Sequence, residues 1–209
     1  MCSIISNWEH WFVGFFCSAI PMFIAVFWGN LKLFQPFSKL QKMGVEKIFI
    51  NQSKAIQSIV EECKNTEKLR VFAVRGSTFS DKENSGIAKA SLENANLKQF
   101  YLLSSPNNVH LKNRAIKLDV EDMYLNSLKQ SISIIKKASQ DHSTIKLLLH
   151  KEIVRFRIIL LDNYLFLSFV EDKPTRQSEV LKIIKNSSLY KTYSELFDEL
   201  WDKCNNQNE

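Results

Sequence analysis

The feature that most constrains this chain is a run of 21 uncharged residues, 11–31, between Glu9 and Lys32. As a helix, the run would extend about 31 Å, roughly the thickness of the hydrocarbon core of a bilayer. Tryptophans lie near both of its ends, where an indole ring favours the membrane interface. We therefore predict that residues 1–31 form an N-terminal transmembrane helix.

A cleavable signal peptide is the alternative interpretation of this run. Residues 1–10 contain no Lys or Arg, however, and the apolar run is longer than the usual core of a signal peptide. Four lysines lie within residues 32–47, just after the run, and none precedes it. The positive-inside bias then predicts a single-pass protein of the inner (cell) membrane, with its N-terminus outside and its C-terminal domain in the cytoplasm. The cysteines, which show no metal or disulfide spacing, favour the same reducing compartment.

The charge of the remaining chain indicates the kind of partner. Residues 32–209 hold 28 Lys and Arg and 21 Asp and Glu, because Glu9 is the one acid before them, so their net charge is 28 − 21 = +7. A basic domain suits an anionic partner, such as nucleic acid, a nucleotide or the inner leaflet of the membrane. Charge alone does not choose among these.

The apolar pattern predicts a linker at 32–44, a cytoplasmic domain at 45–204 and a disordered tail at 205–209. Runs with strand character alternate with runs at helical spacing, which favours an α/β domain with a mixed sheet flanked by helices. We expect strands at 45–50, 69–74, 97–104, 144–150, 154–161 and 164–170, an edge strand at 179–185, and helices at 53–65, 87–96, 118–138 and 192–204. The linkers between 144–150, 154–161 and 164–170 are so short that we expect antiparallel hairpins there.

Two arginines stand at the start of the strand predicted over 154–161. Strand alternation places Arg155 and Arg157 on one face, together with Ile159 and Leu161. Two cations on one face are costly to bury without a partner, so they reach the rim of the sheet or meet an anion. Asp162 lies about 16 Å along the strand from Arg157, which is too far for a direct ion pair.

Arg155, Arg157 and Asp162 form R-x-R-x-x-x-x-D, which resembles the H-x-K-x-x-x-x-D signature of the phospholipase D-like superfamily. The apolar strands on both sides of the motif are similar too. Two features of the family are missing here: the nucleophilic histidine, and the Gly-Ser followed by Asn that normally succeeds the motif. The resemblance implies a phospholipase D-like fold behind the transmembrane helix.

The missing histidine changes what such a site would do. The family's mechanism needs an imidazole as nucleophile, whereas a guanidinium stays protonated and binds phosphate through two hydrogen bonds. We therefore expect a catalytically inactive domain whose arginines hold a phosphate-bearing ligand, either a nucleotide or nucleic acid. His150, which ends the preceding strand, is a further candidate ligand, although a hydrogen-bonded surface histidine is the alternative. We expect no metal and no cofactor.

A second candidate site follows the strand predicted over 69–74. Arg75, Gly76, Ser77 and Thr78 begin a polar loop whose backbone N–H groups and side chains suit an anion. The carboxyl end of a strand in an α/β sheet is a usual place for a ligand. An ordinary solvated loop is the alternative.

The alternative for Arg155 and Arg157 is a set of salt bridges with acids such as Glu171 and Asp172. A tight turn at 162–163 would bring residues 169–171 opposite 154–156.

Three functions follow from these alternatives. The preferred one is a membrane-bound sensor of a phosphate-bearing ligand, by analogy an effector of antiphage defence. The others are a membrane-anchored phosphodiesterase or nuclease that acts as a dimer, and an adaptor for a protein partner, for example one encoded in the same operon. Small residues beside Pro21 in the predicted span suit helix packing, so we expect a homo-oligomer.

Overall fold

The computed structural model describes residues 38–76, 94, 96–169 and 179–206. The chain divides into two compact units, residues 1–43 and 44–209. The described part of the first unit is a helical turn at 38–42. The transmembrane helix predicted over 1–31 lies outside the described residues. Within the described ranges, no helix has both the length and the apolar character needed to cross a membrane.

The second unit contains seven strands and four helices among its described residues. The strands form one sheet in the order β1-β7-β6-β5-β2-β3-β4. In chain order the elements are β1 (Val45–Phe49), α2 (Gln52–Cys63), β2 (Lys68–Ala73), β3 (Lys98–Ser104), α5 (Val109–Lys117), α6 (Glu121–Asp141), β4 (Ile145–His150), β5 (Phe156–Leu160), β6 (Tyr164–Phe169), β7 (Val180–Ile184) and α7 (Ser188–Asn206).

The sheet is parallel on one side and antiparallel on the other. β2, β3 and β4 run parallel, whereas β5 pairs antiparallel with β2, and β6, β7 and β1 continue the antiparallel pattern. We call the end at which β2, β3 and β4 finish the carboxyl end of the sheet, and the opposite end the amino end. Because β5 runs against β2, β5 starts at the carboxyl end.

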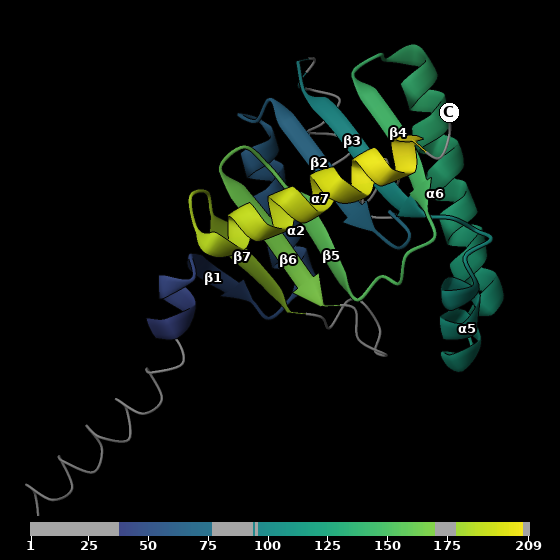
Figure 1. The fold of residues 1–209 in the computed structure, drawn as a ribbon, viewed down its shortest axis with the longest axis horizontal. Coiled ribbons are helices and arrows are strands. Elements are labelled where there is room, and N and C mark those ends of the chain that lie inside the picture. The colour runs from purple at the N-terminus through teal and green to yellow at the C-terminus, as the bar shows by residue number, and fades with distance from the viewer. Residues whose placement is uncertain (1–37, 77–93, 95, 170–178, 207–209) are drawn as a thin grey trace, which may run out of the picture. The chain divides into compact units, whose positions relative to one another are not determined.

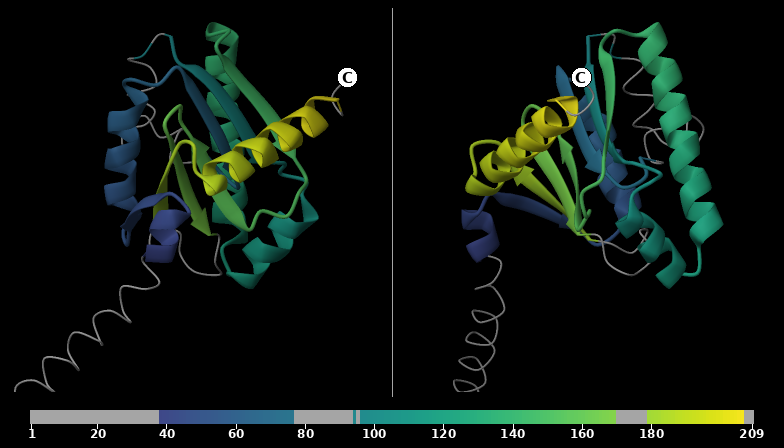
Figure 2. Two further views of the ribbon diagram at one scale, coloured as in Figure 1. Left: turned by 60° about the vertical axis from the view of Figure 1, so that its left-hand side comes forward. Right: turned by 45° about the vertical axis from the view of Figure 1, so that its right-hand side comes forward.

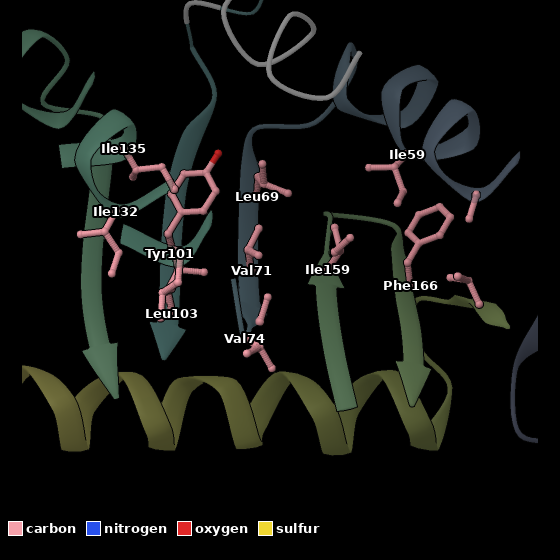
Figure 3. Packing of buried hydrophobic residues seen from close by; sticks show 14 of the residues in the cluster. Ile59, Leu69, Val71, Val74, Tyr101, Leu103, Ile132, Ile135, Ile159 and Phe166 are labelled. Atoms are coloured by element: carbon pink, nitrogen blue, oxygen red, sulfur yellow. The ribbon is translucent and has the colours of Figure 1, made fainter. Parts of the chain in front are cut away.

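Helices cover both faces of the sheet. α7 crosses one face, and α6 lies on the other (Figure 1 and Figure 2). The α6 face holds the larger hydrophobic core, to which α2, α5 and α6 contribute apolar side chains. Figure 3 shows Val71, Tyr101, Ile159 and Phe166 from neighbouring strands pointing into this core. On the α7 face, alternation along the strands places Phe72 and Ile158, and α7 adds the buried Phe197.

Most predicted strands and helices are found within a few residues of their expected bounds. The turn at 162–163 is confirmed, because Leu161 N donates to Tyr164 O at 2.8 Å and Phe156 pairs with Phe169. The helix predicted over 87–96 lies almost wholly outside the described residues.

Several local predictions were wrong. The short 151–155 linker does not make a hairpin of β4 and β5: β4 pairs in parallel with β3, and β5 pairs with β2. β7 is not an edge strand, because β1 pairs with its outer side. α2 begins one residue before its expected start at 53 and is capped by Asn51, whose side chain accepts from Ser53 N at 2.7 Å. The sequence pattern did not predict α5, which is capped by the side chain of Asn108.

The fold-class prediction also needs correction, because it relied on a phospholipase D-like motif. In the structure, the motif residues lie at opposite ends of β5. Arg157 lies near the start of the strand, whereas Asp162 lies beyond its end, where Oδ2 accepts a hydrogen bond from Glu67 N at 2.7 Å. A spacing along one strand does not determine which strands pair with it. The motif therefore does not predict the strand order of this sheet.

Candidate anion-binding site

Arg157 lies where the large side chains of the core give way to small ones. It is two residues from the buried Ile159 and therefore shares the α6 face of the sheet. Its partner on β6 is Ser168, and the register with β2 continues to place Ala73 on its other side. These small neighbours leave room for a long side chain that is half-buried. The pKa of Arg157 is lowered to about 10, first by burial and then by the nearby charge of Arg75.

Arg75 approaches the same place from the carboxyl end of β2. Its guanidinium carbon lies 4.4 Å from the ring centroid of Tyr124, a buried residue in the first turn of α6. This cation–π contact restrains the guanidinium of Arg75. The structure thus brings together Arg75 and Arg157, which the sequence analysis had placed in two separate candidate sites. Both arginines have partners within the structure.

Gly76 turns the chain directly after Arg75. Its φ is +69°, and a Cβ atom at this position would lie 2.9 Å from a methyl carbon of Leu103. Only glycine adopts this left-handed conformation without strain and fits against the core here. Ser77 and Thr78, the other members of the predicted loop site, lie outside the described residues.

Arg155 does not join this pair as predicted. It precedes β5 and is exposed, and the ion pairs found among residues 38–76, 94, 96–169 and 179–206 do not include it. The acids proposed as its alternative partners, Glu171 and Asp172, lie outside those ranges. Arg155 is therefore at most a solvated neighbour of the pair in the described structure.

His150 ends β4 at the carboxyl end, but on the α7 face, opposite the arginines. It is 1% exposed, and its ring packs 4.8 Å from that of Phe72. Neither ring nitrogen has a well-formed hydrogen bond with the described residues. Burial lowers the pKa of His150 to about 4, although the Ala73 backbone and Glu152 favour the charged form. The side chain is thus a neutral core imidazole, and neither a ligand beside the arginines nor a surface histidine.

Sequence reasoning missed Tyr124. It lies on the buried stripe of α6, with Leu128, Ile132 and Ile135. Its helical spacing from Leu128 was visible, and this spacing predicts burial. It does not predict that a cation from β2 would lie over the ring.

Other groups in the described chain offer less chemistry. No group of three or more His, Cys, Asp and Glu side chains gathers there as a metal site would require. Cys63 is buried, and burial raises the pKa of its thiol to about 12, so it stays protonated and inert.

The comparisons with known proteins identify no family. No protein-family model and no curated protein matches the sequence. A solved structure that it resembles is that of TrmBL2, described as an archaeal chromatin protein with a novel mode of DNA binding. The two share 14% identity at a TM-score of 0.47, over 95% of this chain and 66% of that one.

Proposed function

We propose that the domain binds a phosphate-bearing ligand, either a nucleotide or nucleic acid, through Arg75 and Arg157. The observation that carries this proposal is that Arg75, two residues after the end of β2, and Arg157, on the adjacent β5, both lie at the carboxyl end of the sheet, near enough for the charge of Arg75 to lower the pKa of Arg157. The proposal concerns binding alone. It does not depend on the membrane span expected at 1–31 or on a wider role as a defence effector.

The electrostatics of the pair support an anionic ligand. Two like charges repel, and burial removes part of the water that would screen them. A pKa of about 10 still leaves Arg157 charged at physiological pH. Guanidinium groups are suited to phosphate because they donate two parallel hydrogen bonds.

The position of the pair agrees with this role. Ligands of α/β proteins usually bind beyond the carboxyl ends of parallel strands. Arg75 follows that end of β2, whose parallel neighbour is β3, and Arg157 lies near the start of β5, the antiparallel neighbour of β2. The net charge of +7 on residues 32–209 would also attract a polyanion.

The chemistry of the two arginines favours binding over turnover. A guanidinium has no usable lone pair and does not act as a nucleophile. His150, the imidazole closest to the predicted motif in sequence, is buried on the opposite face. Phosphodiesterase turnover that is lost on His150→Ala, or on mutation of His110 in the first turn of α5 to Ala, would instead favour the enzyme alternative.

The test is a binding titration of the full chain, followed by fluorescence anisotropy, with a labelled oligonucleotide and with nucleotides as competitors. Arg75→Gln and Arg157→Gln should each weaken binding about tenfold or more, since each removes charge-assisted hydrogen bonds. Lys64→Ala/Lys185→Ala is the matched control, because it removes two exposed charges at the amino end of the sheet. Unchanged affinity in both arginine variants would overturn the proposal and favour an adaptor.

A further inference from the structure

We infer that the edge strand β4 is a homodimer interface, at which the β4 strands of two copies of this chain pair antiparallel across a two-fold axis at Leu147. The inference is independent of the proposed function, because neither arginine of the candidate site takes part in it. The sequence analysis expected a homo-oligomer from helix packing in the N-terminal run, whereas this interface lies in the folded domain.

The two edges of the sheet differ in how they are protected from pairing. β1 and β4 are the outermost strands among the described residues. β1 has a register irregularity between Val45 and Lys47, and its Glu46 and Lys47 are exposed. Bulges and charged side chains on an edge strand oppose pairing with another chain. β4 pairs with β3 without such an irregularity, and Lys146 is its one lysine, arginine or acid.

The hydrogen bonds to β3 identify the backbone groups of β4 that point outward. Gln99 N donates to Thr144 O at 2.8 Å, and Ser105 N donates to His150 O at 2.7 Å. The N–H and C=O groups of successive residues alternate between the two sides of a strand. Those of residues 145, 147 and 149 therefore point away from β3.

Most of these outward groups have no hydrogen bond with the described residues. The N–H of Ile145 donates to His142 O at 3.0 Å, but its carbonyl and both backbone groups of Leu147 and Leu149 make no such bond. α6 and α7 contact β4 from its two faces (Figure 2). The leucines of β4 are half-buried, so water reaches the strand only in part. Backbone groups in such a place favour a strand as their partner.

A two-fold axis at Leu147 pairs these groups with the same strand of a second copy. The N–H of Leu147 then donates to the carbonyl of Leu147 of the partner subunit, and the N–H of Leu149 donates to the carbonyl of Ile145 of the partner subunit. The symmetry repeats each bond in the opposite direction. Of the unpaired outward groups, only the carbonyl of Leu149 is left without a partner.

The side chains of β4 are self-complementary in the same register, which favours a second copy over an unrelated strand. Lys146 lies opposite Leu148 of the partner subunit, so no like charges face each other. On the α6 face, Ile145 lies opposite Leu149 of the partner subunit. Ile145 belongs to the core there, and Leu147 and Leu149 pack against it. Pairing therefore continues the apolar face from one sheet into the other.

The first experiment measures the mass of the full chain against concentration by analytical ultracentrifugation. We expect a dimer for the wild type. Leu147→Pro removes an N–H that the sheet itself does not use, and proline is tolerated on edge strands at such positions. It should raise the dissociation constant of the dimer about tenfold or more. Leu147→Lys should act in the same direction, whereas Ile50→Lys, at a position 79% exposed beyond β1, should leave the dimer unchanged.

The second experiment tests the register by cross-linking with diamide as the oxidant. A Cys2→Ser/Cys17→Ser background leaves only the buried Cys63 and Cys204. Leu147→Cys places two thiols in a directly opposed pair, whose Cα atoms are about 5.5 Å apart, within the range of a disulfide. This variant should form a covalent dimer. Lys146→Cys, one residue away and out of register with itself, should not.

Several outcomes would overturn the inference. They are a wild type that is monomeric at every concentration, a dimer that Leu147→Pro and Leu147→Lys leave unchanged, and cross-linking at 146 in preference to 147. Thermal melting shows whether each variant is folded, and if the Leu147 variants do not fold, the cross-linking result decides. Loss of phosphate binding in the arginine variants has no bearing on this interface, so the two proposals fail separately.

Discussion

Buried charged side chains have different surroundings at the two ends of the sheet. At the amino end, Arg70 donates to both carboxylate oxygens of Asp198 on α7 at 3.0 Å. Lys182 is likewise held by Glu62 at 2.9 Å. At the carboxyl end, Arg157 lies near a second arginine, Arg75, and both have partners within the structure, whereas neither ring nitrogen of the buried His150 has a well-formed hydrogen bond with the described residues.

The difference indicates what each end is for. Opposite charges at the amino end satisfy groups that folding has removed from water, so they support the folded state. At the carboxyl end, the desolvation of Arg157 and of the His150 imidazole opposes stability, and such desolvated groups are common in ligand-binding regions. Arg70 and Arg157 lie on neighbouring strands. Mutating each of them therefore distinguishes an arginine that stabilises the fold from one that binds a ligand.

The largest expected effect concerns His150 and pH. Its folded-state pKa of about 4 lies below the ordinary value of 6.5, so the unfolded chain binds the extra proton first. Stability should be full above pH 6.5 and fall by about 3 kcal/mol as the pH drops towards 4. Urea unfolding between pH 7 and 4 measures this loss. His150→Leu should flatten this part of the profile, whereas the exposed His142→Gln should not; identical profiles for all three proteins would contradict the assignment.

The next effect is the loss of the carboxylate at the amino end. Asp198→Ala leaves the buried Arg70 without its bidentate partner and should lower the free energy of unfolding by about 2 kcal/mol. Water reaches this rim, where the Asp198 side chain is 55% exposed, and partly replaces the hydrogen bonds that Arg70 loses. Glu199→Ala, an exposed neighbour on α7, is the matched control in the same urea titration. Equal stability of the two variants would remove the contrast between the ends.

Asp162→Ala tests the family motif at the amino end. The change removes the acceptor for Glu67 N and should destabilise the fold by about 1 kcal/mol. Asp162→Asn retains an oxygen acceptor and should lose less. Phosphate binding should stay unchanged in both variants, because Asp162 lies at the far end of β5 from the arginines. Weaker binding in a variant that melts like the wild type would show that the motif acts as a unit.

The smallest effect on stability is expected at Arg157. Arg157→Met removes a half-buried charge whose desolvation and repulsion with Arg75 oppose its contacts within the fold, so we expect the free energy of unfolding to change by no more than about 0.5 kcal/mol, together with loss of phosphate binding. Arg155→Met, at the exposed start of the same strand, is the control and should change neither stability nor binding. Destabilisation as large as that of Asp198→Ala would assign Arg157 a structural role.

The local sequence pattern was sufficient to predict most strands and helices, but it was insufficient to predict which strands pair. The alternation in 164–170 and the helical spacing in 118–138 predicted β6 and α6, because burial on one face leaves a period in the sequence. The linker after β4 resembled a hairpin connection only in its length. β4 pairs with β3 and β5 with β2 because that arrangement completes the core between distant segments, and no local period records it.

The candidate site divides in the same way. The amino-acid sequence by itself identified Arg157, Arg75 and Gly76 as residues of interest, since cations beside an apolar strand and a glycine after it are unusual enough to need a reason. Only the tertiary structure decided that Arg75 and Arg157 share one place, that Tyr124 lies beneath one of them, and that His150 and Asp162 lie elsewhere. The physical reason is that side-chain chemistry is a local property, whereas the distance between two charges depends on which strands become neighbours.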